Sequence, residues 1–255
     1  MTQAAVADDP VQVEPGWGQG RATFGGVIGA LLVARMRGLL DDPRPLRSVG
    51  VQLAAPVVGG PVQVEAQIVR QGRSVTLVQA VLRQDGAVAA TGQAAFGASR
   101  PSSVTVPAGG RLDRPAFPPA GELPELPNPP GTPEFFRHVD FRLATGALPF
   151  SGAAEPDFGG WMRWREPVPG FNVEHLVALI DTWPPAMTPL LPGPAPVSTL
   201  TWTIELFTEE FTDDWWQYRV HTDACAHGYG HAGAHVWNAA GELAAISRQT
   251  VTVFD

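Results

Sequence analysis

Asp181 occupies a position in the sequence where a carboxylate can act as a general base. It follows Val173 and Val177 by eight and four residues in an apolar run with helical spacing, so it lies at the edge of the apolar stripe. Partial burial at that edge disfavours the charged carboxylate, raises its pKa and makes it a better base. A buried charge also needs hydrogen-bond partners, because leaving it unpaired is costly. The alternative is an exposed helix acid without a chemical role.

A run of histidines around the only cysteine is a second place where reactive side chains gather. Six residues there share odd-numbered positions: His221, Asp223, Cys225, His227, His231 and His235. A common strand face would suit a metal ion, but glycines interrupt the segment and the spacing matches no zinc-ligand pattern. We therefore expect these side chains to line a strand face or crevice, and we expect no metal site and no cofactor.

Two short patterns imitate known motifs. Residues 228–233 match G-x-G-x-x-G, but they precede a predicted strand and not a helix, so we expect no dinucleotide site. Residues 97–101 begin like the nucleophile elbow G-x-S-x-G and fail at Pro101, which argues against an α/β-hydrolase.

The composition excludes further function classes. All 17 basic side chains are arginine, and the absence of lysine excludes a P-loop, a protein kinase and a Schiff-base enzyme. A net charge of −8 argues against nucleic-acid binding. The sequence has no apolar run of membrane-spanning length, an acidic N-terminus unlike a signal peptide, and a single cysteine, Cys225, which cannot form an internal disulfide. We expect a cytoplasmic protein without membrane insertion.

One helix and several strands are predicted for the first half. The helix spans residues 25–40, with Thr23 as its N-cap, and ends before Asp41-Asp42-Pro43. Asp85-Gly86 is typical of a hairpin turn. The strands are expected at residues 46–55, 62–70, 74–84 and 87–96.

The second half repeats this order. A helix is predicted at residues 172–183, ended by Pro184-Pro185. The strands are expected at residues 197–207, 215–223, 233–237 and 242–254. The closing strands of the two halves can be overlaid, residues 85–90 on 240–245 and 93–96 on 248–251. Each half is therefore predicted to be a helix with an antiparallel meander, an α+β unit that is duplicated.

A proline-rich segment separates the two halves. Residues 101–133 hold ten of the 26 prolines and show no helical or strand periodicity. Such a segment joins domains and lies outside a core. The predicted organisation is a first unit at residues 1–100, the linker at 101–133 and a second unit at 134–255, which carries the catalytic residues.

Six motifs carry a resemblance to the double-hotdog acyl-CoA thioesterases, the thioesterase II group. They are residues 23–26 (Thr-Phe-Gly-Gly), 70–74 (Arg-Gln-Gly-Arg-Ser), 84–86 (Gln-Asp-Gly), 179–181 (Leu-Ile-Asp), 198–202 (Ser-Thr-Leu-Thr-Trp) and 247–249 (Ser-Arg-Gln). The resemblance covers nearly the whole chain except its termini and the linker. It implies two tandem hotdog units, each an antiparallel sheet wrapped around a long helix, that pair into one continuous sheet.

The resemblance also implies a site and a reaction. Asp181 would activate a water molecule that Thr199 and Gln249 position, and an acyl-CoA would be hydrolysed to free acid and coenzyme A without an acyl-enzyme. The family often has Asp-His after the Thr, whereas this chain has Leu200-Thr201-Trp202, which leaves Ser198 as an alternative to Thr199 and suggests a divergent pocket. The substrate would be a fatty or other acyl-CoA.

The first predicted helix offers donors for the charge that develops on the thioester oxygen. Backbone N–H groups at a helix N-terminus lack helical partners and favour negative charge. We expect Gly26, and with less support Gly25, to serve this oxyanion. In the overlay Gln249 falls on Ala94, so we expect one active site per chain, between the halves.

Other readings remain open. A non-catalytic acyl- or acyl-CoA-binding hotdog protein would have a vestigial site, and a hotdog hydratase would need a histidine beside an acid. His175 precedes Asp181 by six residues and faces elsewhere on the helix, which counts against the hydratase. Arg70 and Arg73 could meet the phosphates of coenzyme A or lie in a solvated turn. The resemblance further implies a homodimer of the double unit.

Overall fold

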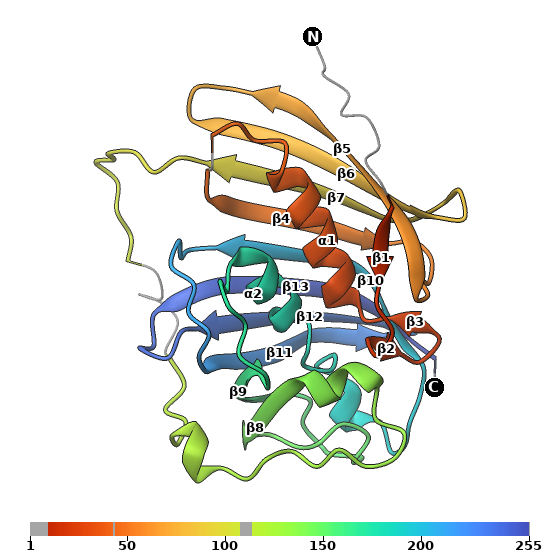
Figure 1. Ribbon diagram of the computed structural model, residues 1–255. Coiled ribbons are helices and arrows are strands. Elements are labelled where there is room, and N and C mark those ends of the chain that lie inside the picture. Colours follow the sequence, from red (N-terminus) through yellow and green to blue (C-terminus); the bar gives the residue numbers. More distant parts are fainter. Residues whose placement is uncertain (1–9, 43, 108–113, 255) are drawn as a thin grey trace.

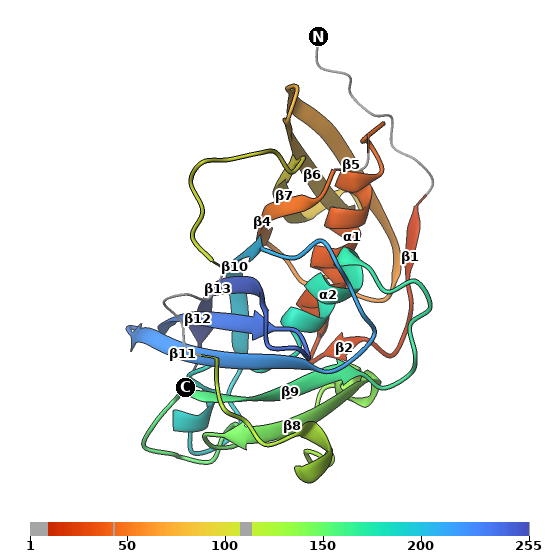
Figure 2. The same cartoon turned by 90° about the vertical axis from the view of Figure 1, so that its left-hand side faces the viewer.

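The fold is a large antiparallel β-sheet with two α-helices packed on one of its faces (Figures 1 and 2). The computed structural model describes residues 10–42, 44–107 and 114–254. None of the helices in these ranges is long and apolar enough to cross a membrane.

The helices and strands divide between the two halves of the chain. The first half contains α1 (Gly25–Arg37), β1 (Val11–Val13), β2 (Gly18–Gln19), β3 (Ala22–Thr23), β4 (Leu46–Leu53), β5 (Gly60–Gln71), β6 (Val75–Gln84) and β7 (Ala87–Gly97). The second half contains α2 (Val173–Ile180), β8 (Val139–Thr145), β9 (Phe158–Trp164), β10 (Val197–Leu206), β11 (Trp216–Ala226), β12 (Tyr229–Trp237) and β13 (Leu243–Val253). Short 3₁₀ helices lie at Ala120–Glu122, Glu134–His138 and Thr188–Leu190.

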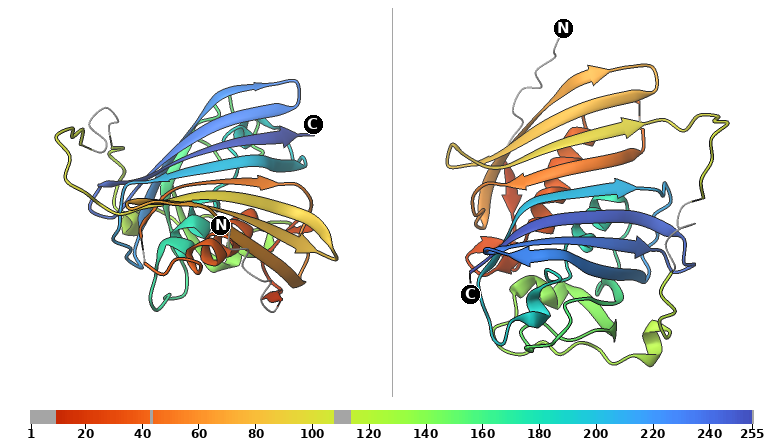
Figure 3. Two further views of the ribbon diagram at one scale, coloured as in Figure 1. Left: turned by 90° about the horizontal axis from the view of Figure 1, so that it is seen from above. Right: turned by 180° about the vertical axis from the view of Figure 1, so that it is seen from behind.

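One sheet runs through both halves. Its strand order within the described residues is β1-β5-β6-β7-β4-β10-β13-β12-β11-β9-β8, while β2 and β3 form a small ribbon of their own. The halves meet where β4 pairs antiparallel with β10, with Gly50 opposite Thr203. Seen from above, the sheet curves around the helices (Figure 3).

The two helices pack closely against each other beneath this seam. A β-carbon placed on Gly26 would lie 2.5 Å from the carbonyl oxygen of Ala178, so only glycine permits this approach of α1 to α2. At the other end of α1, the guanidinium of Arg37 lies 2.6 Å from the carboxylate of Glu174 on α2. The helix pair therefore fixes one half on the other in addition to the strand pairing.

Most predicted elements of the first half are present with small differences at their ends. The four strands correspond to β4, β5, β6 and β7, and Asp85-Gly86 forms the turn between β6 and β7 with both residues at positive φ. Helix α1 ends at Arg37 and not at Leu40. The expected N-cap was wrong: Thr23 lies in β3, and the capping position belongs to Phe24, which makes no side-chain capping bond.

The second half departs further from expectation. Helix α2 ends at Ile180, because Asp181 takes the C-cap and Thr182 returns a hydrogen bond from its hydroxyl to the carbonyl of Leu179 at 2.7 Å. Strands β8 and β9 were not predicted. Strand β12 begins at Tyr229 and not at residue 233, because His227 and Gly228 make a tight turn at positive φ and the following glycines stay in the strand.

Residues 114–133 of the proline-rich segment are held against the outer strands of the second half. The indole N–H of Trp161 donates to the carbonyl of Pro118 at 2.9 Å, and the N–H of Leu126 donates to the carbonyl of Phe141 on edge strand β8 at 3.1 Å. Most of this segment is exposed, as expected of a linker, but Ala120 is buried.

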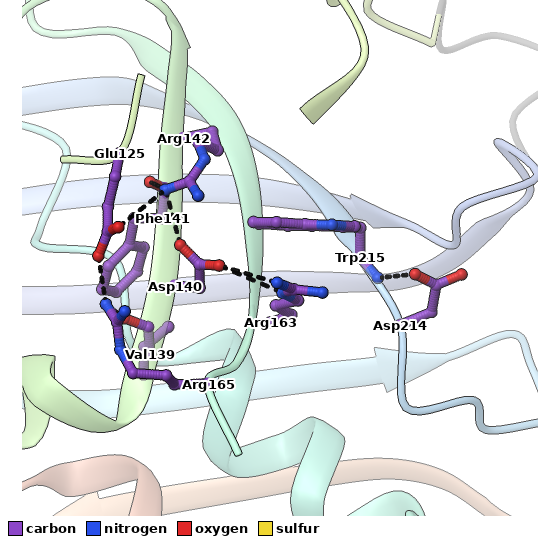
Figure 4. Close-up of polar contacts among 9 residues, drawn as sticks. All are labelled: Glu125, Val139, Asp140, Phe141, Arg142, Arg163, Arg165, Asp214 and Trp215. Carbon is purple, nitrogen blue, oxygen red and sulfur yellow. Dashed lines mark hydrogen bonds and ion pairs between the residues drawn. The ribbon is translucent and has the colours of Figure 1, made fainter. Parts of the chain in front are cut away.

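A network of charges fastens the same segment (Figure 4). Glu125 pairs with Arg165 on one side and with Arg142, at 3.8 Å, on the other. Asp140, which is buried, binds Arg142 at 2.7 Å and Arg163 at 3.1 Å. The guanidinium of Arg163 lies 4.4 Å from the ring centre of Trp215 and gains a cation–π contact.

The segment before α1 crosses to the second half. The ring of Trp17 stacks on His138 with centroids 4.2 Å apart, and Phe24 stacks on Phe135 at 4.1 Å. The N–H of Gly18 donates to the carboxylate of Glu134 at 3.2 Å. Residues near the start of the chain therefore pack on the half that follows the linker.

Candidate active site

Asp181 is held at the C-terminal end of α2. The helix is anchored by its apolar side, on which Leu176, Val177, Leu179 and Ile180 are fully buried. Its N-terminus is closed by a capping box between Asn172 and His175. The backbone of Asp181 is thus fixed by a helix that is packed along its length.

The carboxylate of Asp181 is hydrogen-bonded from both halves of the chain. Gln249 on β13 donates from Nε2 to Oδ1 at 2.6 Å. The backbone N–H of Gly26, in the first turn of α1, donates to the same carboxylate. A β-carbon on Gly25 would lie 2.9 Å from Oδ2 of Asp181 and 3.2 Å from Leu53. The acid therefore lies between the N-terminus of α1 and the covered face of β13.

Burial shifts the acid–base properties of this group. It raises the pKa of Asp181 from 3.8 to about 7, while the hydrogen bonds from Gln249 and Gly26 act in the opposite direction. The carboxylate is therefore close to half ionised at neutral pH, the range in which a general base works best. The pKa of the Tyr218 phenol is also raised, mainly by burial and to a lesser extent by the nearby negative charge of Asp181. Tyr218 therefore stays protonated.

Thr199 lies on the same covered face of the sheet as Gln249. It pairs with Val251 on β13, and a bulge follows before Thr201. The burial pattern puts Thr199 on the covered face and Ser198 on the exposed face, so Thr199 is the hydroxyl that points toward the helices. Within the described residues it makes no side-chain hydrogen bond to Asp181 or Gln249.

The structure thus brings together Asp181, Gln249 and the Gly25-Gly26 pair, while Thr199 makes no side-chain hydrogen bond to Asp181 or Gln249 within the described residues. From the sequence we expected the backbone N–H of Gly26 to donate to the oxyanion. In this structure it donates a hydrogen bond to the carboxylate of Asp181. The resemblance placed the N-terminus of the first helix at a site between the halves, but a direct bond from Gly26 to Asp181 was not predicted.

Trp202 is the residue next to Gln249 that sequence reasoning left unassigned. The two are cross-strand partners on β10 and β13, and Trp202 is 1% exposed. Its indole N–H donates to the hydroxyl of Ser247 at 2.8 Å. A β-carbon on Gly29 of α1 would lie 2.6 Å from its ring, so the indole fills the space between β10 and α1.

A small cavity of about 10 Å³ lies on the other side of Gln249. It is lined by Pro185, Ala186, Tyr218, Val220, Ala232, Ala234, Ser247 and Gln249. This is space for about one water molecule, and Tyr218, Ser247 and Gln249 offer it polar partners. A larger hollow of about 200 Å³ is lined mainly by exposed residues, Thr201, Thr203, His231, Arg248, Gln249 and Thr250.

The remaining candidates lie away from Asp181. His221 contacts Asp223 at 3.3 Å and stacks on His235 with centroids 5.9 Å apart, so these two histidines share a strand face, whereas His227 lies in the turn between β11 and β12. In the described part of the chain no three acidic, histidine or cysteine side chains are grouped to hold a metal ion. The ring of His175 is engaged by Asn172 in the helix cap. Arg70 and Arg73 are exposed at the β5–β6 turn.

Comparison with protein families identifies both halves. The model of the acyl-CoA thioesterase N-terminal domain matches residues 13–97, and that of the acyl-CoA thioesterase C-terminal domain matches residues 117–253. The chain belongs to the acyl-CoA thioesterase family. It is a thioester hydrolase of the thioesterase II-like kind.

Solved structures agree on the fold. A protein of unknown function with a hot dog fold from Alicyclobacillus acidocaldarius is 25% identical in sequence. The alignment covers 99% of this chain and 96% of that protein, and the TM-score is 0.87. Acyl-CoA thioesterase II TesB2 from Mycobacterium marinum is 20% identical, with 96% of each chain covered and a TM-score of 0.75. No curated protein matches the chain in sequence.

Proposed function

We propose that this acyl-CoA thioesterase hydrolyses its substrate by general-base activation of water at Asp181. The observation that carries the proposal is the short bond from Gln249 to a carboxylate whose pKa burial raises to about 7. A free carboxylate with its ordinary pKa would be a weak base, and an acid without partners would be costly to bury.

The reaction follows from these groups. Asp181 takes a proton from water as the water oxygen bonds to the thioester carbonyl carbon. The tetrahedral intermediate then collapses, the carbon–sulfur bond breaks, and the proton held by Asp181 passes to the sulfur of coenzyme A. The products are the free acid and the thiol, and no acyl-enzyme forms.

Neighbouring groups orient the water and the carbonyl. Gln249 donates to Asp181 through its amide nitrogen, so its amide oxygen remains to accept a hydrogen from the water. Thr199 adds a hydroxyl from the covered face of β10. The first-turn N–H groups of α1 supply the oxyanion donors, with Gly25 available while Gly26 holds Asp181.

The duplicated arrangement accounts for a single site in each chain. We propose that the two helix-and-meander halves are fused hotdog units and that the second alone carries the acid and the amide. Ala94 on β7 pairs with Val49 of β4, as Gln249 on β13 pairs with Trp202 of β10. The first half then contributes the N-terminus of α1 to the shared site.

The test is thiol release from a series of acyl-CoA thioesters by the wild type, Asp181→Asn and a control, Glu205→Gln, at an exposed acid on β10. We expect Asp181→Asn to lower kcat by a factor of about 100 or more, because the general base is lost, and Glu205→Gln to retain activity. Equal release by the wild type and Asp181→Asn would contradict the mechanism. Tight binding of acyl-CoA without turnover by the wild type would favour an acyl-binding protein.

A further inference from the structure

We infer that the acyl pocket beside Gln249 accepts a short acyl group and excludes long fatty chains. The inference deepens the proposed function and rests on hydrolysis at Asp181. Its support comes from the surroundings of Gln249 on the covered face of the sheet. Trp202 fills the space on one side, Met187 blocks a second direction, and only a small cavity remains.

Trp202 fills the side that faces the first half. Across the sheet, Gln249 has Trp202 of β10 as one neighbour and Ala232 of β12 as the other. The indole is fully buried against Gly29 and is fixed by its bond to Ser247. An acyl chain that leaves the thioester therefore cannot run toward α1 and has to turn over the small side chain of Ala232.

Met187 closes the direction toward the β11–β12 turn. It belongs to the segment that follows α2 and is 1% exposed. Its side chain lies over Gly230, the next residue on the covered face of β12, where any β-carbon would collide with the methionine methyl group and lie 3.2 Å from Val251. The backbone glycine and the methionine together form a wall one row beyond Gln249.

Pro185 and Ala186 narrow the remaining space. Together with Ala232 and Ala234 they line a cavity of about 10 Å³. That is the size of one water molecule, whereas a long fatty chain needs a channel many times larger. The prolines of the same segment restrict its backbone, since each fixes φ. A methyl group is about as large as a water molecule, so the site as built suits an acetyl group.

The first experiment compares kcat/KM of the wild type for acetyl-, butyryl-, octanoyl- and palmitoyl-CoA. We expect acetyl-CoA to be preferred over palmitoyl-CoA by a factor of about 10 or more, with butyryl-CoA and octanoyl-CoA in between. Turnover with a preference for palmitoyl-CoA overturns the short-chain pocket and leaves the hydrolase intact. Turnover of no thioester at all overturns the proposed function instead.

The second experiment removes the wall. Met187→Ala should raise the octanoyl-to-acetyl ratio of kcat/KM by a factor of about 10. The control is Met36→Ala on α1, another fully buried methionine, which packs against Gly92 of the first half and should leave the ratio unchanged. Equal shifts in both variants would mean general loosening and would contradict the wall at Met187.

A binding measurement separates the pocket from the chemistry. Asp181→Asn can be titrated with acetyl-CoA and palmitoyl-CoA by calorimetry, because the substrate survives. We expect acetyl-CoA to bind at least as tightly as palmitoyl-CoA. A large gain in affinity with chain length would reject the short-chain pocket whether or not the wild type hydrolyses the thioester.

Discussion

At the scale of single residues, the site depends on one acid kept in an environment that disfavours its charge. Burial raises the pKa of Asp181 from 3.8 to about 7, so the folded protein binds this proton more tightly than the unfolded chain does. Stability from this group is therefore greatest at low pH and is lost as the pH rises from about 4 to about 7. Burial of this candidate base therefore lowers the stability of the folded protein at neutral pH.

The same shift predicts how activity depends on pH. We expect kcat/KM to rise with pH through a midpoint near the Asp181 pKa of about 7, because only the carboxylate accepts a proton from water. Gln249→Ala removes a donor that favours the carboxylate, so it should move the midpoint upward as well as lower kcat. The measurement is a pH–rate profile for each enzyme. A wild-type midpoint near 4, or a midpoint that falls in Gln249→Ala, would contradict this assignment.

At the scale of elements, the N-terminus of α1 is completed by the other half of the chain. A local cap was expected from Thr23, but the capping position has no side-chain bond and the N–H of Gly26 binds Asp181 instead. A sequence pattern shows only neighbours along the chain, so it cannot reveal a partner that arrives from another helix. The hydrogen bond that completes the N-terminus of α1 is therefore also a hydrogen bond to the candidate base, Asp181.

The elements themselves were predictable where one face is buried and the other is exposed. Strand β6 alternates buried and exposed residues along its length, and its turn to β7 has the Asp-Gly pair of a tight hairpin. Strand β9 is buried on both faces under the linker and α2, so alternation is absent and it went unpredicted. The pairing of Asp181 with Gln249 followed from the family resemblance. The packing of Trp202 and Met187 around Gln249 could not be predicted, because it brings together segments that are far apart in the sequence.

A glycine substitution tests the helix contact. Gly26→Ala should destabilise the protein by about 1–3 kcal/mol and lower kcat, because the new methyl group would overlap the carbonyl oxygen of Ala178 and the ring of Phe24 and move α1 away from Asp181. Chemical denaturation and thiol release measure the two effects. Gly121→Ala, where a β-carbon meets nothing within 4 Å, is the control and should be neutral. Unchanged stability of Gly26→Ala would show that the helices do not pack as described.

At the scale of the whole molecule, the two halves are joined in several independent ways. The β4–β10 pairing, the contact between α1 and α2, and the stacking of Trp17 on His138 and of Phe24 on Phe135 all cross between them. Independent unfolding of one half would break all of these contacts at once. The molecule should therefore unfold as a single unit.

Tryptophan fluorescence can test this cooperativity. Seven of the eight tryptophans lie after residue 160, and Trp17 packs on the second half, so the emission reports that half. Leu82→Ala, in the core of the first half, should cost about 2–5 kcal/mol and lower the fluorescence midpoint together with the circular dichroism midpoint. A fluorescence transition that stays at the wild-type position would mean that the halves unfold separately.

The hydrogen bonds that converge on Asp181 have a practical consequence for engineering. Because Gly26 comes from one half and Gln249 from the other, the base has its full set of partners only while both halves are docked. Under the proposed mechanism, turnover should therefore report assembly, and we expect a chain split in the proline-rich segment to regain catalysis when its two fragments associate. Such a pair of fragments would act as a complementation sensor whose signal is the release of coenzyme A.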